Sequence, residues 1–280
     1  MDRRFGARLR AAMDEHGPLC VGIDPHPGLL AAWGLPDDAG GLKRFGETVI
    51  EALAGRVAAV KPQSAFFERR ASNGVAVLES IIRHLRQSGT LVILDIKRGD
   101  IGSTAAAYAD AYLDPASPLA ADAVTASPYL GVGALRPMID SALAAGSGVF
   151  VLARTSNPEG SALQRAVTAS GRTVAQTVID EISQVNDGVE PMGDVGVVVG
   201  ATIGSDADEP TLDLDGMGGP ILAPGLGAQG GRPEDLRRIF GPAAPRVLAA
   251  YSREILGHGP SVTDLRAAAD RVLADLRHNL

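Results

Sequence analysis

The fold of this chain is constrained most by a regular alternation between short apolar runs and longer segments with helical spacing. Eight strands that alternate with helices are typical of repeated βα units with a parallel sheet. Eight such units within 280 residues predict an α/β protein, a single-domain (β/α)8 TIM barrel spanning residues 1–280. The alternative is a doubly wound open sheet, but no Gly-x-Gly-x-x-Gly motif follows the first strand. The expected strands are Leu19–Ile23, Val57–Val60, Leu91–Arg98, Ala123–Thr125, Gly148–Leu152, Val195–Val199, Ile221–Ala223 and Arg246–Ala250.

Helical periodicity accounts for most of the chain between these strands. The first expected helix, within residues 1–17, is amphipathic, because Phe5, Leu9 and Met13 fall on one face. Residues 28–41 are rich in Gly and Pro and are expected to form a loop, whereas residues 203–219 are rich in Asp and Gly and predict at most one short helix. The other expected helices are 42–53, 75–87, 103–112, 135–144, 171–186, 233–240 and 262–276.

Composition excludes several classes of partner. The net charge is −7, whereas a nucleic-acid surface needs a basic face, so we expect no nucleic-acid partner. No apolar run approaches the roughly 20 residues of a membrane span, and we expect no membrane partner. Cys20 is the only cysteine, which leaves no internal disulfide or thiolate metal cluster and favours the cytoplasm.

The stretch from Leu91 to Asp100 combines a buried strand with charged residues. Four aliphatic residues are followed by Asp95 and Lys97, which sit two apart and therefore point to the same side of a strand. Burying an unpaired charge is costly, so such groups occur where they are paired or functional. A salt-bridged strand end would explain an isolated Asp-x-Lys, but similar strand endings recur along this chain.

Polar residues directly follow each of the eight apolar runs, and in a barrel these positions share the catalytic rim. Three carboxylates and two ammonium groups would share a small volume there, so their titrations are expected to be coupled. A lysine held charged beside an aspartate can serve as a general acid. The strand-end residues are Asp24, Lys61, Asp95, Lys97, Asp100, Ser127, Thr155, Ser156, Thr202, Gln229, Ser252 and Arg253.

A phosphate site is predicted after the last two strands. The loop Pro224–Gly231 is rich in Gly and Ala, so its backbone N–H groups can approach an anion, and the next helix adds its positive end. A Gly-rich loop alone is compatible with a simple turn. Arg253, at the end of the next strand, adds a planar guanidinium suited to phosphate, and the pair favours phosphate binding.

The remaining candidate residues are assigned no catalytic role. The five histidines lack metal-ligand spacing, so no metal site is expected, and His26 is interpreted as a solvent-facing neighbour of Asp24. Cys20, within a strand, is expected to be an inert buried thiol.

Taken together, these residues resemble orotidine 5′-phosphate decarboxylase, and the wording around Asp24 and Lys61 is similar to its longer bacterial subgroup. Relatives that decarboxylate or cleave phosphosugars share Asp-x-Lys-x-x-Asp, but they place an acidic residue where Lys61 stands and bind magnesium. Lys61 therefore favours the metal-free branch. The matching positions, in the family's order, are Asp24, Lys61, Asp95, Lys97, Asp100, Ser156, Pro224–Gly231 and Arg253.

The resemblance implies decarboxylation of orotidine 5′-monophosphate to uridine 5′-monophosphate and CO2 in UMP biosynthesis, without a cofactor. It assigns proton donation at C6 to Lys97, and it places Asp95 against the departing carboxylate. It further implies that Lys61 and Asp24 contact the ribose, that Ser156 contacts the pyrimidine, and that Ser252 lies beside the substrate. The remaining implied roles are phosphate binding by Gln229 and Arg253, and entry of Asp100 and Thr104 into the neighbouring site of a homodimer with shared active sites.

Two alternatives remain open at this point. One is a magnesium-dependent phosphosugar lyase on the same barrel, which would lose activity in chelator. The other is a non-catalytic nucleotide- or phosphosugar-binding barrel, in which the charged residues would be dispensable while Arg253 still bound ligand. Buried charges without a function would cost stability, and this disfavours the second alternative.

Overall fold

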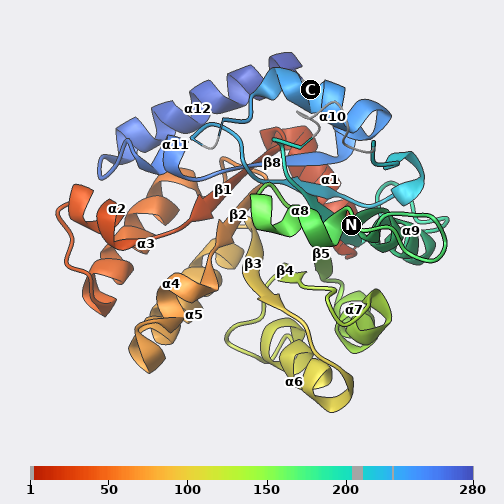
Figure 1. The fold of residues 1–280 in the computed structure, drawn as a ribbon. Coiled ribbons are helices and arrows are strands. Elements are labelled where there is room, and N and C mark those ends of the chain that lie inside the picture. The colour runs from red at the N-terminus through yellow and green to blue at the C-terminus, as the bar shows by residue number, and fades with distance from the viewer. Residues whose placement is uncertain (1–2, 204–210, 229, 280) are drawn as a thin grey trace.

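Eight parallel strands close into one barrel in the order β1 to β8, and this excludes the open sheet. The computed structural model describes residues 3–203, 211–228 and 230–279. Figure 1 shows the helices arranged around the central strands. The strands are β1 Leu19–Ile23, β2 Ala59–Pro62, β3 Leu91–Arg98, β4 Ala123–Ala126, β5 Gly148–Arg154, β6 Val195–Val199, β7 Ile221–Ala223 and β8 Val247–Tyr251.

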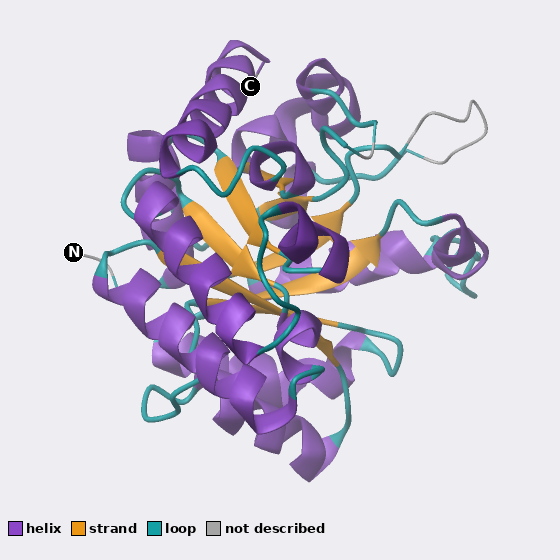
Figure 2. Cartoon of the chain, turned by 90° about the vertical axis from the view of Figure 1, so that its left-hand side faces the viewer, coloured by secondary structure: helices purple, strands orange, loops and turns teal. Residues whose placement is uncertain are grey.

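Helices follow the strands and enclose them (Figure 2). None of the helices in the described part of the chain has the length and apolar content needed to cross a bilayer. The 3-10 helices are η1 Val132–Leu135, η2 Asp215–Met217 and η3 Gly241–Arg246. The α-helices are α1 Phe5–His16, α2 Pro27–Ala32, α3 Ala39–Leu53, α4 Ser64–Glu68, α5 Ala71–Gln87, α6 Gly102–Leu113, α7 Arg136–Ala145, α8 Pro158–Gln164, α9 Val174–Val185, α10 Pro233–Phe240, α11 Arg253–Leu256 and α12 Val262–Asn279.

The predicted loop at residues 28–41 is wrong, because two capped helices occupy much of it. α2 begins after His26, whose ring Nδ1 accepts the N–H of Leu29 at 3.2 Å. α3 begins after Asp38, whose carboxylate accepts the N–H of Gly41 at 2.8 Å. Between β6 and β7, η2 is the helical segment among the described residues, and residues 204–210 lie outside them.

The core of the protein has two layers. The larger lies between the strands and the surrounding helices, and the smaller lies inside the barrel. α1 belongs to the inner layer: Phe5, Leu9 and Met13 are buried against strand residues such as Phe150. The rings of Phe5 and Phe150 meet edge to face, with their centroids 5.9 Å apart. The apolar face of α1 therefore closes the amino-terminal end of the barrel and leaves the opposite end for ligands.

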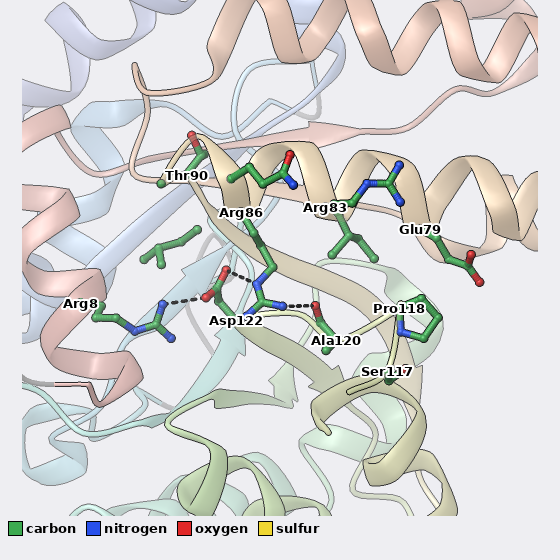
Figure 3. Close-up of a pocket in the computed structure, with 13 residues that line it drawn as sticks. Arg8, Glu79, Arg83, Arg86, Thr90, Ser117, Pro118, Ala120 and Asp122 are labelled. Atoms are coloured by element: carbon green, nitrogen blue, oxygen red, sulfur yellow. Dashed lines mark hydrogen bonds and ion pairs between the residues drawn. The ribbon is translucent and has the colours of Figure 1, made fainter. Parts of the chain in front are cut away.

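A cavity of about 550 Å³ beside α1 contains a partly buried ion pair between Arg8 and Asp122 (Figure 3). Asp122, which is 6% exposed, accepts Arg8 Nη1 at 2.6 Å and the N–H of Val92 at 2.9 Å. Arg86 approaches the same carboxylate to 4.0 Å and donates to the carbonyl of Ala120 at 3.1 Å. These contacts join α1, α5 and the starts of β3 and β4, so we interpret the cluster as a structural clamp.

Replacing Asp122 with alanine is expected to destabilise the protein by about 2 kcal/mol, because it leaves Arg8 Nη1 and the buried N–H of Val92 without their acceptor. Denaturant titration measures this change as a lower midpoint. The matched control is Asp140→Ala, which breaks an exposed Arg136–Asp140 pair and should cost no more than about 0.5 kcal/mol. Equal midpoints for the two variants would contradict the structural role of Asp122.

Candidate active site

A cavity of about 830 Å³ lies at the carboxyl ends of the strands. Every strand of the barrel contributes to its wall, as expected for the catalytic end of this fold. The contributing residues, one from each strand in order, are Gly22, Lys61, Asp95, Thr125, Leu152, Val198, Leu222 and Ala250.

The structure brings most of the predicted site residues to this cavity. Asp100 and Thr104 do not line it, nor do the strand-end residues Ser127 and Thr202, so the expectation that all the strand ends converge is wrong. Gln229 lies outside the described residues. The predicted residues that line the cavity are Asp24, Lys61, Asp95, Lys97, Thr155, Ser156, Ser252 and Arg253.

Asp95 is the centre of a compact charge network. Its side chain is almost fully buried, with the residue 4% exposed. Lys61 Nζ lies 2.8 Å from Oδ2, and Lys97 Nζ lies 2.5 Å from Oδ1. Thr125 Oγ1 donates a third hydrogen bond to Oδ1, at 2.7 Å. The carboxylate is therefore held in one orientation by donors on three strands.

The electrostatic environment keeps Asp95 and Lys61 charged. Burial alone would raise the pKa of Asp95, but Lys61 and Lys97 hold the pKa below its ordinary value. Burial alone would lower the pKa of Lys61, but Asp95 and Asp24 raise it above its ordinary value. The stabilisation from Asp95 is lost only as the pH falls through its depressed pKa, and that from Lys61 only as the pH rises through its raised pKa. Both groups therefore stay charged throughout the physiological range.

Lys97 reaches the cavity by a route that simple strand alternation does not describe. Its φ is +47°, a left-handed conformation that is uncommon for a residue other than glycine. The pairing of β3 with β4 shifts register between Leu94 and Arg98, which marks an irregularity in the strand. The prediction that Asp95 and Lys97 share a side is correct in outcome, since both line the cavity. The side chain of Lys97 is 46% exposed, so its ammonium remains accessible to a ligand.

Two buried polar atoms beside β1 have no protein partner in the described part of the chain. They are Asp24 Oδ1 and Ser252 Oγ. Both residues flank Gly22, where a Cβ would lie 2.8 Å from Asp24 Oδ2 and 3.2 Å from Ser252 Oγ. Buried polar groups normally have partners, so this pair is suited to hydroxyl groups of a ligand. The closeness of Gly22 explains why a larger residue does not fit there.

In the loop Pro224–Gly231, the described residues 224–228 and 230–231 form a turn beside Arg253. Its Gly227 and Gly230 have positive φ, and Gly227, Gly230 and Gly231 donate their N–H groups to carbonyls within the loop. These three amides are thus engaged, contrary to the expectation that the loop amides face an anion. Arg253 lines the cavity, and its guanidinium has no hydrogen bond or ion pair with another described residue, so it is available to bind an anion.

Sequence reasoning missed several residues that line the cavity. His26 is half-buried there together with Asp24, so it is less exposed than a solvent-facing residue, and Phe66 packs near its ring with centroids 6.4 Å apart. Gln63 donates to the carbonyl of Asp95 at 3.2 Å. Gln63 and Thr125 follow or end apolar runs, which is the signal that could have found them. Cys20 is fully buried, and burial raises its pKa to about 12, as expected of an inert thiol.

No cluster of three or more His, Cys, Asp or Glu residues that could hold a metal occurs among residues 3–203, 211–228 and 230–279.

A family model described as orotidine 5′-phosphate decarboxylase / HUMPS matches residues 17–268. The chain belongs to this family. This is the family that the sequence motifs resemble, and the match includes the strands that line the cavity and carry the charge network.

Several named relatives cover nearly the whole chain. An orotidine 5′-phosphate decarboxylase from Salinispora arenicola is 70% identical over 273 residues, covering 98% of this chain and 97% of the relative. One from Streptomyces coelicolor is 58% identical over the same length, with the same coverage. A solved structure from Streptomyces avermitilis is 56% identical, with a TM-score of 0.95, covering 99% of this chain and 95% of that one. The structure of Leishmania donovani OMP decarboxylase is 28% identical, with a TM-score of 0.75 and 98% of each chain covered.

Proposed function

We propose that this chain decarboxylates orotidine 5′-monophosphate to uridine 5′-monophosphate and CO2, a step of UMP biosynthesis, without a metal or organic cofactor. The observation that carries the proposal is the carboxylate of Asp95, held between Lys61 and Lys97 at the wall of the catalytic-end cavity. Family membership supports the assignment. The single buried cysteine is consistent with a cytoplasmic enzyme.

Lys97 is the proton donor in this proposal. Loss of CO2 leaves an electron pair on C6 of the pyrimidine, and the ammonium of Lys97 stabilises that charge and transfers its proton to the carbon. Asp95 fixes the ammonium at 2.5 Å and lies against the departing carboxylate. Because Lys61 and Lys97 hold the pKa of Asp95 well below its ordinary value, the Asp95 carboxylate is a weak proton acceptor and leaves the proton on Lys97 for transfer to C6. The network therefore holds the ammonium of Lys97 in position before the substrate binds.

The rest of the cavity matches the other parts of the substrate. Asp24 and Ser252 each have a buried oxygen without a partner among the described residues, next to Lys61, and these oxygens are suited to the ribose hydroxyls. Ser156 lines the cavity and is assigned to the pyrimidine edge. Arg253 is assigned to the phosphate together with Gln229. Binding of these remote groups supplies energy that orients the reacting ring against Lys97.

The reaction is tested by following the orotate absorbance of orotidine 5′-monophosphate with the purified chain in the presence of a strong chelator. We expect complete conversion at an undiminished rate, with uridine 5′-monophosphate as the product. Activity that disappears in chelator and returns with magnesium would instead support the phosphosugar-lyase type of site. Binding of uridine 5′-monophosphate without any turnover would support the non-catalytic alternative.

Replacing Arg253 with alanine is expected to raise KM by about 10- to 100-fold with a much smaller change in kcat, because a charge-assisted phosphate contact is made in ground state and transition state alike. Steady-state kinetics separate the two parameters. Arg271→Ala, on the outer helix α12, is the matched control and should leave both unchanged. An unaltered KM in Arg253→Ala would contradict the phosphate assignment.

We also propose that the active unit is a homodimer with shared sites. Asp100 does not line the cavity of its own barrel, and its carboxylate accepts the neighbouring N–H of Ile101 at 2.8 Å. Thr104, on the exposed part of α6, also does not line the cavity of its own chain, which is compatible with a role in a second chain's site. Ile101 is 62% exposed, and Tyr129, in the loop after the adjacent strand, is 78% exposed. Exposed apolar side chains beside Asp100 are suited to contact with a second copy.

A further inference from the structure

We propose that Thr125 is a positioning residue that sets the geometry of the donor, because its one hydroxyl fixes both the carboxylate of Asp95 and the backbone of Lys97. The inference rests on the proposed role of Lys97 as proton donor. Thr125 lies on β4, is 1% exposed and lines the catalytic-end cavity. It would act through these two neighbours and not on the substrate.

The irregularity in β3 creates the need for such a residue. Leu94 pairs with Val124 and Arg98 pairs with Ala126, so three residues of β3 lie opposite Thr125 alone. Regular ladder hydrogen bonds cannot serve all three residues. The N–H of Lys97 instead donates to Thr125 Oγ1 at 2.9 Å. The side chain of Thr125 thus takes the place of a backbone acceptor within the irregular segment.

The hydroxyl of Thr125 is used in both directions. A hydroxyl carries one proton and two lone pairs. Its proton goes to Asp95 Oδ1 at 2.7 Å, and its lone pair receives the N–H of Lys97. Asp95 Oδ1 also receives the ammonium of Lys97 at 2.5 Å. Backbone, hydroxyl, carboxylate and ammonium therefore form a closed ring that includes both ends of Lys97.

This ring stabilises a conformation that Lys97 does not otherwise prefer. A left-handed backbone is unfavourable for a residue with a Cβ and persists where surrounding contacts hold it. Without the hydroxyl, the backbone of Lys97 loses its acceptor and Asp95 loses one of the donors that fix its rotation. Lys61 would still pair with the carboxylate, at 2.8 Å, so the charge network would persist with Lys97 displaced.

The test compares Thr125→Val, which keeps the shape but removes the hydroxyl, with Thr125→Ser, which restores it. We expect kcat to fall by about 100-fold in Thr125→Val with KM within a few-fold, since a small misplacement of a reacting group has an effect of that order. Thr125→Ser should recover most of kcat. Thr125→Ala provides a second hydroxyl-free variant and should match Thr125→Val.

Thr90→Val is the matched control, because Thr90 is also buried, at 3% exposed, and its hydroxyl accepts the N–H of Gly55 at 2.8 Å before the start of β3. It removes a similar hydrogen bond at the far end of the barrel, so kcat should not change. A fall in kcat equal to that of Thr125→Val would mean that the effect is only structural.

Crystal structures provide a readout that does not depend on activity. In Thr125→Val, the ammonium of Lys97 should move away from Asp95 Oδ1, and the backbone φ of Lys97 should leave the left-handed region. An unchanged Lys97 with normal kcat would overturn the role of Thr125 while leaving the proposed function intact. If Lys97→Ala itself turned over normally, the proposed function would fail instead, so the two failures are distinguishable.

Discussion

Lys97→Ala should lose turnover by several orders of magnitude while still binding uridine 5′-monophosphate. The variant lacks the group that we propose donates a proton to C6 and stabilises the charge that develops there. The residues assigned to ribose and phosphate, Asp24 and Arg253, are separate from Lys97 along the cavity wall and remain. Binding should therefore survive when turnover does not.

Single-turnover kinetics and calorimetric titration with the product measure the two properties separately. The matched control is Lys43→Ala, which removes an exposed lysine that lies 3.8 Å from Glu47 on α3. It should leave both properties unchanged. Near-normal turnover by Lys97→Ala would overturn the assignment of the proton donor. Loss of product binding together with turnover would show that Lys97 mainly holds the ligand or the local structure.

The barrel could be predicted because each strand can be recognised from the residues of a short, continuous segment. Each strand is a short apolar run, and each polar strand end is visible as a change of residue type, as at Lys61 or Asp95. Short helices were harder to predict. α2 depends on a cap from the ring of His26, and its two buried leucines contact the core rather than forming a long periodic pattern. A Gly- and Pro-rich composition therefore suggested a loop where the chain is helical.

The finer geometry of the site could not be predicted because it depends on neighbouring strands. The left-handed backbone of Lys97 follows from a register shift against β4, and the link from Thr125 to Asp95 joins residues 30 apart in sequence. Strand alternation placed the two charges together for a simpler reason than the actual one. The structure also separates Asp100 from the cavity of its own chain, although it lies three residues after Lys97.

The separation of Asp100 from its own cavity leads to a second prediction, that two inactive variants restore activity when they are combined in one dimer. Lys97→Ala and Asp100→Ala chains should each be nearly inactive alone, but a mixture that is unfolded and refolded together should regain activity. If Asp100 completes the partner's site, one site of each hybrid dimer contains both substitutions and the other contains neither. Random pairing makes about half of the dimers hybrids, so roughly a quarter of all sites should be intact.

A second mixture controls for the refolding procedure. Asp95 and Lys97 lie 2.5 Å apart in one barrel, so in hybrids of Asp95→Ala with Lys97→Ala every site carries one substitution. This mixture should remain inactive although its chains exchange equally well. Native mass spectrometry establishes the proportion of hybrids in both mixtures.

The activity of the refolded Lys97→Ala and Asp100→Ala mixture is the most direct measurement of a catalytic site built from two chains. We expect about a quarter of wild-type activity when hybrids form at the random proportion, with no recovery in the Asp95→Ala control. Confirmed hybrids without recovered activity would show that Asp100 does not act in the site of a second chain, and would contradict the shared site.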